Sequence, residues 1–152
     1  MPSLERLDMS DNLIQDLAQG SLPSLPALEQ LSVANNVLRS ISDDAFDKLP
    51  SLRYLDLSGN NLTYVPSNGF AKLAVLTTLL LSKNPLGELK NFAFKNLFEL
   101  RNLELNECSI GSVGPKAFAD NVNLERISMD GNRDLTELPD RVLYAAGNLR
   151  CV

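Results

Sequence analysis

The sequence of 152 residues contains no histidine and no tryptophan, and only two cysteines, Cys108 and Cys151. Without histidine the chain cannot form a Ser-His-Asp or Cys-His nucleophile system, or a His-ligated zinc site. Two cysteines cannot supply a framework of disulfides, and no apolar run approaches the roughly 18 residues that a membrane span requires. These shortages predict a chain that has no metal or cofactor and does not insert directly into a membrane.

Basic residues are also in the minority, with 14 Lys and Arg against 19 Asp and Glu and a net charge of −5. Because nucleic acids are bound by basic surfaces, this balance predicts that the chain has no nucleic-acid partner. The sequence also lacks a Gly-rich phosphate loop, a Cys-x-x-Cys pair and a nucleophile elbow.

What the sequence does contain is one internal repeat that fills almost the whole chain. The pattern L-x-x-L-x-L-x-x-N-x-L begins at Leu4 and returns every 24 residues, except for a last step of 25. We divide the chain into one solenoid of six copies and a partial seventh, at residues 4–27, 28–51, 52–75, 76–99, 100–123, 124–148 and 149–152. In the sixth copy an extra residue, Arg133 or Asp134, delays the phase, so Leu135, Leu138 and Leu143 are expected in its later apolar positions.

The alternating L-x-L stretch of each copy predicts a short strand with one buried face, and stacked copies predict a parallel sheet over a continuous core. At the N position, a buried amide offers donors and an acceptor to peptide groups that face the interior after each strand. We therefore expect a structural ladder of Asn12, Asn36, Asn60, Asn84, Cys108 and Asn132.

The two cysteines have separate predicted places. Cys108 is expected to be a buried substitute for Asn in the ladder rather than a reactive thiol. Cys151 is expected on the solvent face of the last strand, two strand spacings or about 10 Å away, which exceeds the roughly 7 Å limit for a disulfide. We predict no bond between them.

The second half of each copy predicts short or 3₁₀-like turns rather than full helices. Residues 42–49 resemble a capped helical turn with Ser42 as the N-cap, whereas Gly69 is expected to make residues 67–70 less regular. A recurring Phe would form the second wall of the core, and the bulk of these turns predicts a stack that curves with its sheet on the inside.

With these features the sequence resembles the leucine-rich repeat family in its 24-residue form, from Leu4 to the end of the chain. The resemblance implies an α/β fold, a right-handed solenoid with a curved parallel β-sheet on the concave face. The convex face would hold short 3₁₀, helical or irregular turns. This repeat type is commonest in extracellular and cell-surface proteins such as Toll-like receptors, Slit-type guidance proteins, proteoglycans and adhesion proteins.

By this resemblance the chain is expected to be a non-catalytic module that binds a protein or glycan ligand on its concave sheet, in receptor signalling, adhesion or immune recognition. The alternative is an intracellular scaffold or regulator of signalling, located in the cytoplasm. The cysteine-bearing caps of extracellular relatives are missing, so we interpret the chain as a piece of a longer protein whose uncapped ends are open to end-to-end association.

The positions that flank the strand leucines predict the composition of the concave surface. Leu80 is unusual because its position is polar in the other copies, and Tyr54 lies on the neighbouring strand. An apolar centre with a charged rim resembles a protein interface, although single exposed apolar residues are common on any surface. The candidate ligand-binding residues are Arg53, Tyr54, Asp56, Thr78, Leu80, Arg101, Asn102, Glu104 and Arg126.

Three carboxylates, Asp8, Asp56 and Glu104, fall in one column, but two copies apart. The strand spacing predicts about 10 Å between them, wider than the roughly 5 to 9.5 Å of glycosidase pairs. No enzymatic activity is expected. Asn61-Leu62-Thr63 forms a glycosylation sequon, and Asn61 is expected to point outward on the flank of the stack.

Overall fold

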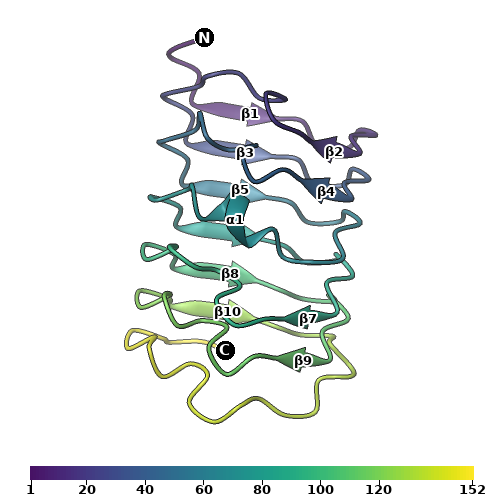
Figure 1. Ribbon diagram of the computed structural model, residues 1–152, viewed down its shortest axis with the longest axis vertical. Coiled ribbons are helices and arrows are strands. Elements are labelled where there is room, and N and C mark those ends of the chain that lie inside the picture. Colours follow the sequence, from purple (N-terminus) through teal and green to yellow (C-terminus); the bar gives the residue numbers. More distant parts are fainter.

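A computed structural model describes all residues, 1–152, and its repeats stack as the turns of one solenoid (Figure 1). Each of the first six turns contributes one strand to a parallel sheet, in the order β1-β3-β5-β6-β8-β10. These strands are β1 (Arg6–Asp8), β3 (Gln30–Ser32), β5 (Tyr54–Asp56), β6 (Thr78–Leu80), β8 (Asn102–Glu104) and β10 (Arg126–Ser128). The predicted solenoid with a parallel sheet is confirmed.

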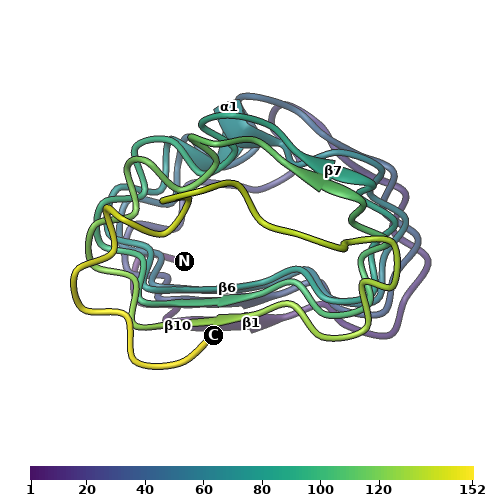
Figure 2. The same cartoon turned by 90° about the horizontal axis from the view of Figure 1, so that it is seen from below.

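The sheet has the register that a repeat of constant length predicts. Leu7 pairs with Leu31, Leu31 with Leu55, and the same column continues to Ile127. From β3 onward this central residue is buried, while its two neighbours lie on the outer face of the sheet. In Figure 2, β1 and β10 lie farther from the turns than β6 does, so the outer face of the sheet is concave.

The opposite wall of the core is lined with phenylalanine. Phe46, Phe70, Phe94 and Phe118 are all buried. The rings of Phe46 and Phe70 stack with centroids 6.2 Å apart, and those of Phe94 and Phe118 with centroids 5.9 Å apart. Stacking of this kind adds to the free energy gained from burial of the rings.

The convex side also has strands, which the sequence analysis did not predict. Strand β2 (Asp16–Leu17) pairs with β4 (Ser40–Ile41), and β7 (Glu88–Leu89) pairs with β9 (Ser112–Val113). No strand lies between β4 and β7 in the third turn (Figure 1). Pro66 stands there at the position where the Ser42 N–H donates to the Leu17 carbonyl at 2.8 Å, and proline has no N–H to donate.

The single helix, α1 (Ser67–Phe70), lies in the segment for which less regular structure was expected. That prediction is wrong, because residues 42–49 form turns and residues 67–70 form the helix. Pro66, with φ of −74°, precedes the first helical residue and restricts the backbone in favour of a helix start. A Cβ on Gly69 would lie 3.2 Å from the Ser42 carbonyl oxygen, so glycine permits close packing on the second turn.

The asparagines at the N position form a continuous ladder through the stack. The Asn60 amide donates to the carbonyls of Val33, one turn earlier, and Leu57, in its own turn, at 3.0 and 2.9 Å. Its oxygen accepts from the Leu38 N–H at 3.0 Å. Asn36, Asn84 and Asn132 bond in the same way, whereas Asn12, in the first turn, bonds only within its own turn.

Cys108 is fully buried within this ladder. Its thiol donates to the Leu81 carbonyl at 3.3 Å, and its own N–H donates to the Asn132 side chain at 2.9 Å. Sulfur offers no acceptor comparable to an amide oxygen, and the Leu86 N–H bonds instead to the backbone carbonyl of Asn84 at 2.8 Å. Both cysteines are free, and Cys151 is exposed.

The sixth turn is covered by a neighbouring turn on one side only. Leu135 and Leu143 pack partly against the core. Leu138, which was expected in an apolar position, is 39% exposed, and no strand forms in its segment. None of the helices is long and apolar enough to cross a lipid bilayer.

We predict that replacing Asn84 with Leu lowers the free energy of unfolding by about 2–4 kcal/mol, since it strands the buried Leu62 N–H and two carbonyls. Urea unfolding measures the loss. Cys108→Asn is the matched control at the same position of the next turn and is expected to be neutral or stabilising. If it destabilises as strongly as Asn84→Leu, the hydrogen-bond account of the ladder is wrong.

Candidate functional site

The nine candidate ligand-binding residues lie on four adjacent strands of the concave sheet or just before them. Tyr54, Thr78, Asn102 and Arg126 form one row across β5, β6, β8 and β10. Asp56, Leu80 and Glu104 form a second row on the other side of the leucine column. Arg53 and Arg101 precede their strands and are exposed.

A hollow of ≈ 490 Å³ on this face brings six of the nine together: Tyr54, Thr78, Leu80, Asn102, Glu104 and Arg126. Arg53, Asp56 and Arg101 do not line it. A second hollow of ≈ 300 Å³ covers the first three strands, and Tyr54 lines both. The Tyr54 ring therefore lies between the two hollows of the concave face.

Leu80 is partly buried and lies between two acidic side chains in the register of the sheet, Asp56 and Glu104. On the parallel row, the Asn102 amide donates to the Thr78 hydroxyl at 3.5 Å. The centre of the hollow thus combines an apolar side chain with polar groups on both sides, a composition found in the centre of protein interfaces.

The charges of this surface are mostly not paired with each other. Arg101 and Glu125 lie 3.6 Å apart, in an exposed pair of little energetic value. Arg53, Arg126, Asp56 and Glu104 form no ion pair. Arg53 and Arg101 lie just before their strands, whereas Asp56 and Glu104 lie in the same row as Leu80. The concave face therefore offers charges of both signs to a partner.

The phenol of Tyr54 reports on this electrostatic environment. Partial burial raises the pKa of Tyr54, and the carboxylates of Asp56 and Glu104 raise it further. Burial likewise raises the pKa of the Cys108 thiol, which keeps it protonated in the ladder.

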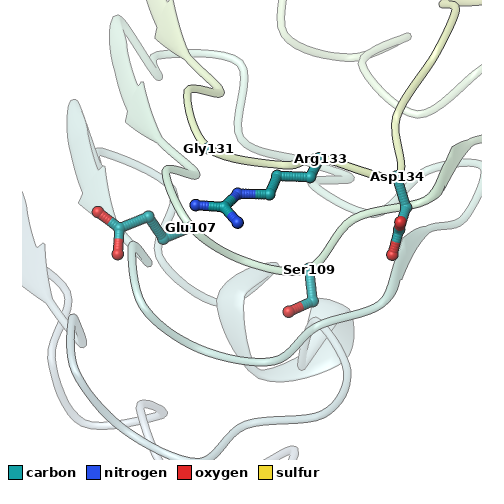
Figure 3. Close-up of a pocket in the computed structure, with 5 residues that line it drawn as sticks. All are labelled: Glu107, Ser109, Gly131, Arg133 and Asp134. Atoms are coloured by element: carbon teal, nitrogen blue, oxygen red, sulfur yellow. The ribbon is translucent and has the colours of Figure 1, made fainter.

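A hollow of ≈ 520 Å³ lies between the segments that follow β8 and β10 (Figure 3). It is lined by Glu107, Ser109, Gly131, Arg133 and Asp134. In Figure 3 the Arg133 guanidinium extends toward Glu107. None of the lining residues is apolar, whereas ligand pockets are normally lined mostly by apolar and aromatic side chains. No group of three or more His, Cys, Asp or Glu side chains is placed to hold a metal ion.

The structure adds residues to the concave hollow that the sequence analysis did not select, namely Ser128, Asp130, Cys151 and Val152. Cys151 pairs with Arg126 as a parallel bridge and continues the row that contains Tyr54. The repeat places Cys151 two residues after Leu149, as Arg126 lies two after Leu124, so the register alone was sufficient to find it. Asn61 and Thr63 of the sequon are both exposed.

Comparison with known proteins supports this architecture. The family model for leucine rich repeats matches residues 2–62, 28–86 and 74–133. No curated protein sequence matches the chain. Among solved structures, the complex of TLR13 with ssRNA13 superposes with a TM-score of 0.93 at 24% identity, and the Drosophila Toll–Spatzle complex with a TM-score of 0.73 at 20% identity.

The chain spans only part of these proteins. Its match covers 97% of the chain and 21% of the TLR13 chain, and 82% of the chain and 16% of the Toll structure's chain. The TLR13 structure contains single-stranded RNA. A solenoid of this shape is therefore compatible with a nucleic-acid ligand, and the general exclusion of nucleic-acid partners is corrected to that extent.

We predict that Tyr54 loses its proton at a higher pH than a free tyrosine, whose pKa is about 10. The folded pKa lies above the unfolded one, so the stability linked to the neutral phenol is complete below about pH 10 and declines as pH rises through the folded pKa. Unfolding free energies of wild type and Tyr54→Phe should therefore differ by a constant up to about pH 10. Wild type alone should then lose this extra stability.

Glu104→Gln should lower the Tyr54 pKa, as phenolate absorbance would show, because it removes one of the negative charges that favour the neutral phenol. A titration curve of Tyr54 that matches free tyrosine in both proteins would contradict the placement of this ring.

Proposed function

Because the chain belongs to the leucine-rich repeat family, we propose that it is a non-catalytic module that recognises a protein ligand through its concave sheet. The supporting observation is the hollow of ≈ 490 Å³ at Leu80, where an apolar side chain, the Tyr54 ring and unpaired charges of both signs meet on one rigid face. Residues held on strands recognise a ligand without much loss of conformational freedom.

Several observations favour a protein over a glycan or a nucleic acid as ligand. The hollow has an aliphatic centre, whereas single-stranded nucleic acids are held by stacked aromatics and a continuous basic groove. Carboxylates lie on both sides of Leu80. A protein segment with an apolar side chain for Leu80 and basic groups for Asp56 and Glu104 complements this surface.

We place this module in an extracellular or cell-surface protein, as part of a receptor or adhesion protein. The repeat length, the Phe position and the exposed Asn61 sequon support this location. The lack of histidine and the wide spacing of the concave carboxylates support a function without catalysis.

We predict that Leu80→Glu weakens binding of the ligand about 30-fold or more, since truncated or charged interface centres commonly cost at least about 2 kcal/mol. Secreted proteins captured by immobilised wild-type chain would first identify the ligand, and titration would then give Kd for each variant. Leu138→Glu is the matched control, because it introduces the same charge at an exposed leucine outside the sheet. Equal affinity of the two variants, or capture of single-stranded RNA in place of protein, would contradict the proposal.

We predict that Asn61 carries a glycan when the chain is secreted from a eukaryotic cell. Intact-mass measurement before and after enzymatic deglycosylation gives the occupancy, and Asn61→Gln should abolish the mass difference. A chain that passes through the secretory pathway with Asn61 unmodified would remove the sequon from the argument for an extracellular location.

A further inference from the structure

The convex strands are interrupted at the third turn, and the phenylalanine stack is interrupted between the third and fourth turns. The strand pairs β2–β4 and β7–β9 lie on either side of this point, with no strand between them (Figure 1). The phenylalanine rings stack within the pairs Phe46–Phe70 and Phe94–Phe118, whereas Phe70 and Phe94 form no stacked pair. We call this place the seam, defined by residues 62–67 and 85–93.

One proline removes a hydrogen bond across the seam. The Asn61 N–H, 24 residues before Pro85, donates to the Leu38 carbonyl of the preceding turn at 2.8 Å. Pro85 lacks the N–H that would make the same bond from the fourth turn to the third, and Pro66 lacks one that would bond to the second turn. The concave sheet is unaffected, since β5 and β6 pair in full.

Several backbone groups here form no hydrogen bond within the chain. Across the seam, the Lys90 N–H donates none and the Thr63 carbonyl accepts none, and the N–H groups of Thr63, Tyr64 and Val65 also donate none. Near the surface such groups bond to water, and a ligand hydroxyl can take the place of that water. Ser67 spans the seam, as its hydroxyl donates to the Ala93 carbonyl at 2.6 Å.

The seam opens as a hollow of ≈ 350 Å³. Its lining is half apolar, with the Tyr64 ring, Val65, Leu86 and Ala93 on one hand and Thr63, Ser67, Glu88 and Lys90 on the other. Tyr64 is 44% exposed, so much of its side chain remains accessible. Glu88 and Lys90 lie 3.9 Å apart and offset each other's charge, which favours a neutral ligand.

We propose that this hollow binds a pyranose, the innermost sugar of a glycan attached to Asn61. A pyranose has an apolar face of C–H groups, suited to the Tyr64 ring, and a rim of hydroxyls, suited to the free peptide groups and to Glu88. This inference rests on the proposed glycosylation of Asn61 and does not depend on the concave ligand.

The attachment point lies within reach of the hollow. Asn61 is two residues before Thr63, a span of at most about 7 Å along the chain, and both side chains are exposed. The Asn61 N–H donates to the Leu38 carbonyl at 2.8 Å. This bond holds the backbone of Asn61, in the third turn, against the second turn. Pro85, 24 residues later, occupies the position of Asn61 in the next turn and precedes Leu86, which lines the hollow.

The experiment compares the same sugar at two equivalent positions. The chain is secreted from a eukaryotic host and trimmed enzymatically to one N-acetylglucosamine, and Tm is compared with that of the Asn61→Gln variant. The control variant, Val37→Asn with Arg39→Thr and Asn61→Gln, moves the sequon to the second turn, where β2 and β4 pair and no seam exists. We expect the sugar on Asn61 to raise Tm by about 2–4 °C, the shift of one added contact in a chain of this size, and the sugar on residue 37 to have little effect.

Tyr64→Ser should remove this gain in the glycosylated protein while changing the Tm of the unglycosylated protein little. An unmodified Asn61, an equal gain at residue 37, or a full gain in Tyr64→Ser would each overturn the proposal. None of these outcomes affects the binding measured with Leu80→Glu.

A second measurement identifies the source of the sugar. Free N-acetylglucosamine added to unglycosylated protein should shift the backbone amide resonances of Thr63–Val65 and Lys90, which form no internal hydrogen bond. Shifts elsewhere, or none, would overturn the hollow as a pyranose site. Shifts at these residues without a Tm gain from the Asn61 glycan would reject the chain's own glycan as the occupant.

Discussion

The structure depends on one requirement, that peptide groups turned toward the core after each strand find hydrogen-bond partners where no water reaches them. The column of asparagines meets it, because each amide joins carbonyls of its own turn and of the turn before, and its oxygen accepts an N–H of that earlier turn. This contact between turns fixes the strand and the turn after it relative to the turn before, whereas the rest of a copy can change length, as in the 25-residue sixth copy, where Cys151 still pairs with Arg126. It also explains why a buried polar column persists inside a leucine core. Where Cys108 replaces the amide, the Leu86 N–H of the preceding turn bonds to the backbone carbonyl of Asn84 instead. The change in hydrogen bonding therefore stays within that turn.

The convex side obeys a weaker version of the same requirement. There the N–H and carbonyl groups are near the surface and water can replace a missing partner, so Pro66 is tolerated at a position where proline would be costly on the concave sheet. The result is a molecule with two kinds of contact between turns. The sheet and the asparagine ladder run without a break from the first turn to the sixth, while the convex strands and the phenylalanine stack fall into two blocks. Local variation in the convex face therefore does not disturb the face that we propose for ligand binding.

Much of the fold could be predicted because its determinants recur at a fixed spacing. The leucine column, the parallel register and the positions of Leu80 and Tyr54 on adjacent strands all follow from a constant repeat. Other features depend on atoms that the pattern does not specify. The convex strands need only two residues each in extended form, too short to leave a period in the sequence. Helix α1 forms despite Gly69 because Pro66 sets its start and because the missing Cβ of Gly69 allows contact with the second turn. Helix propensity, which depends on the local sequence alone, does not include this contact.

The division between buried and exposed positions also bears on specificity. Every copy must supply the same apolar and ladder positions, so those residues cannot distinguish one ligand from another. Recognition is left to the two outward positions of each strand, and stacking brings these together from repeats that are distant in sequence, as with Tyr54, Asn102 and Arg126. Neighbouring strands lie about 4.8 Å apart, so the outward side chains of one repeat lie about one side-chain width from those of the next. Leu80 on β6 lies between carboxylates on the two neighbouring strands, Asp56 and Glu104. This one apolar residue is sufficient to give the otherwise uniform sheet a distinct centre. Specificity arises in this fold where one copy departs from the others, and the seam likewise lies where Pro85 replaces the N–H donor that Asn61 supplies one turn earlier.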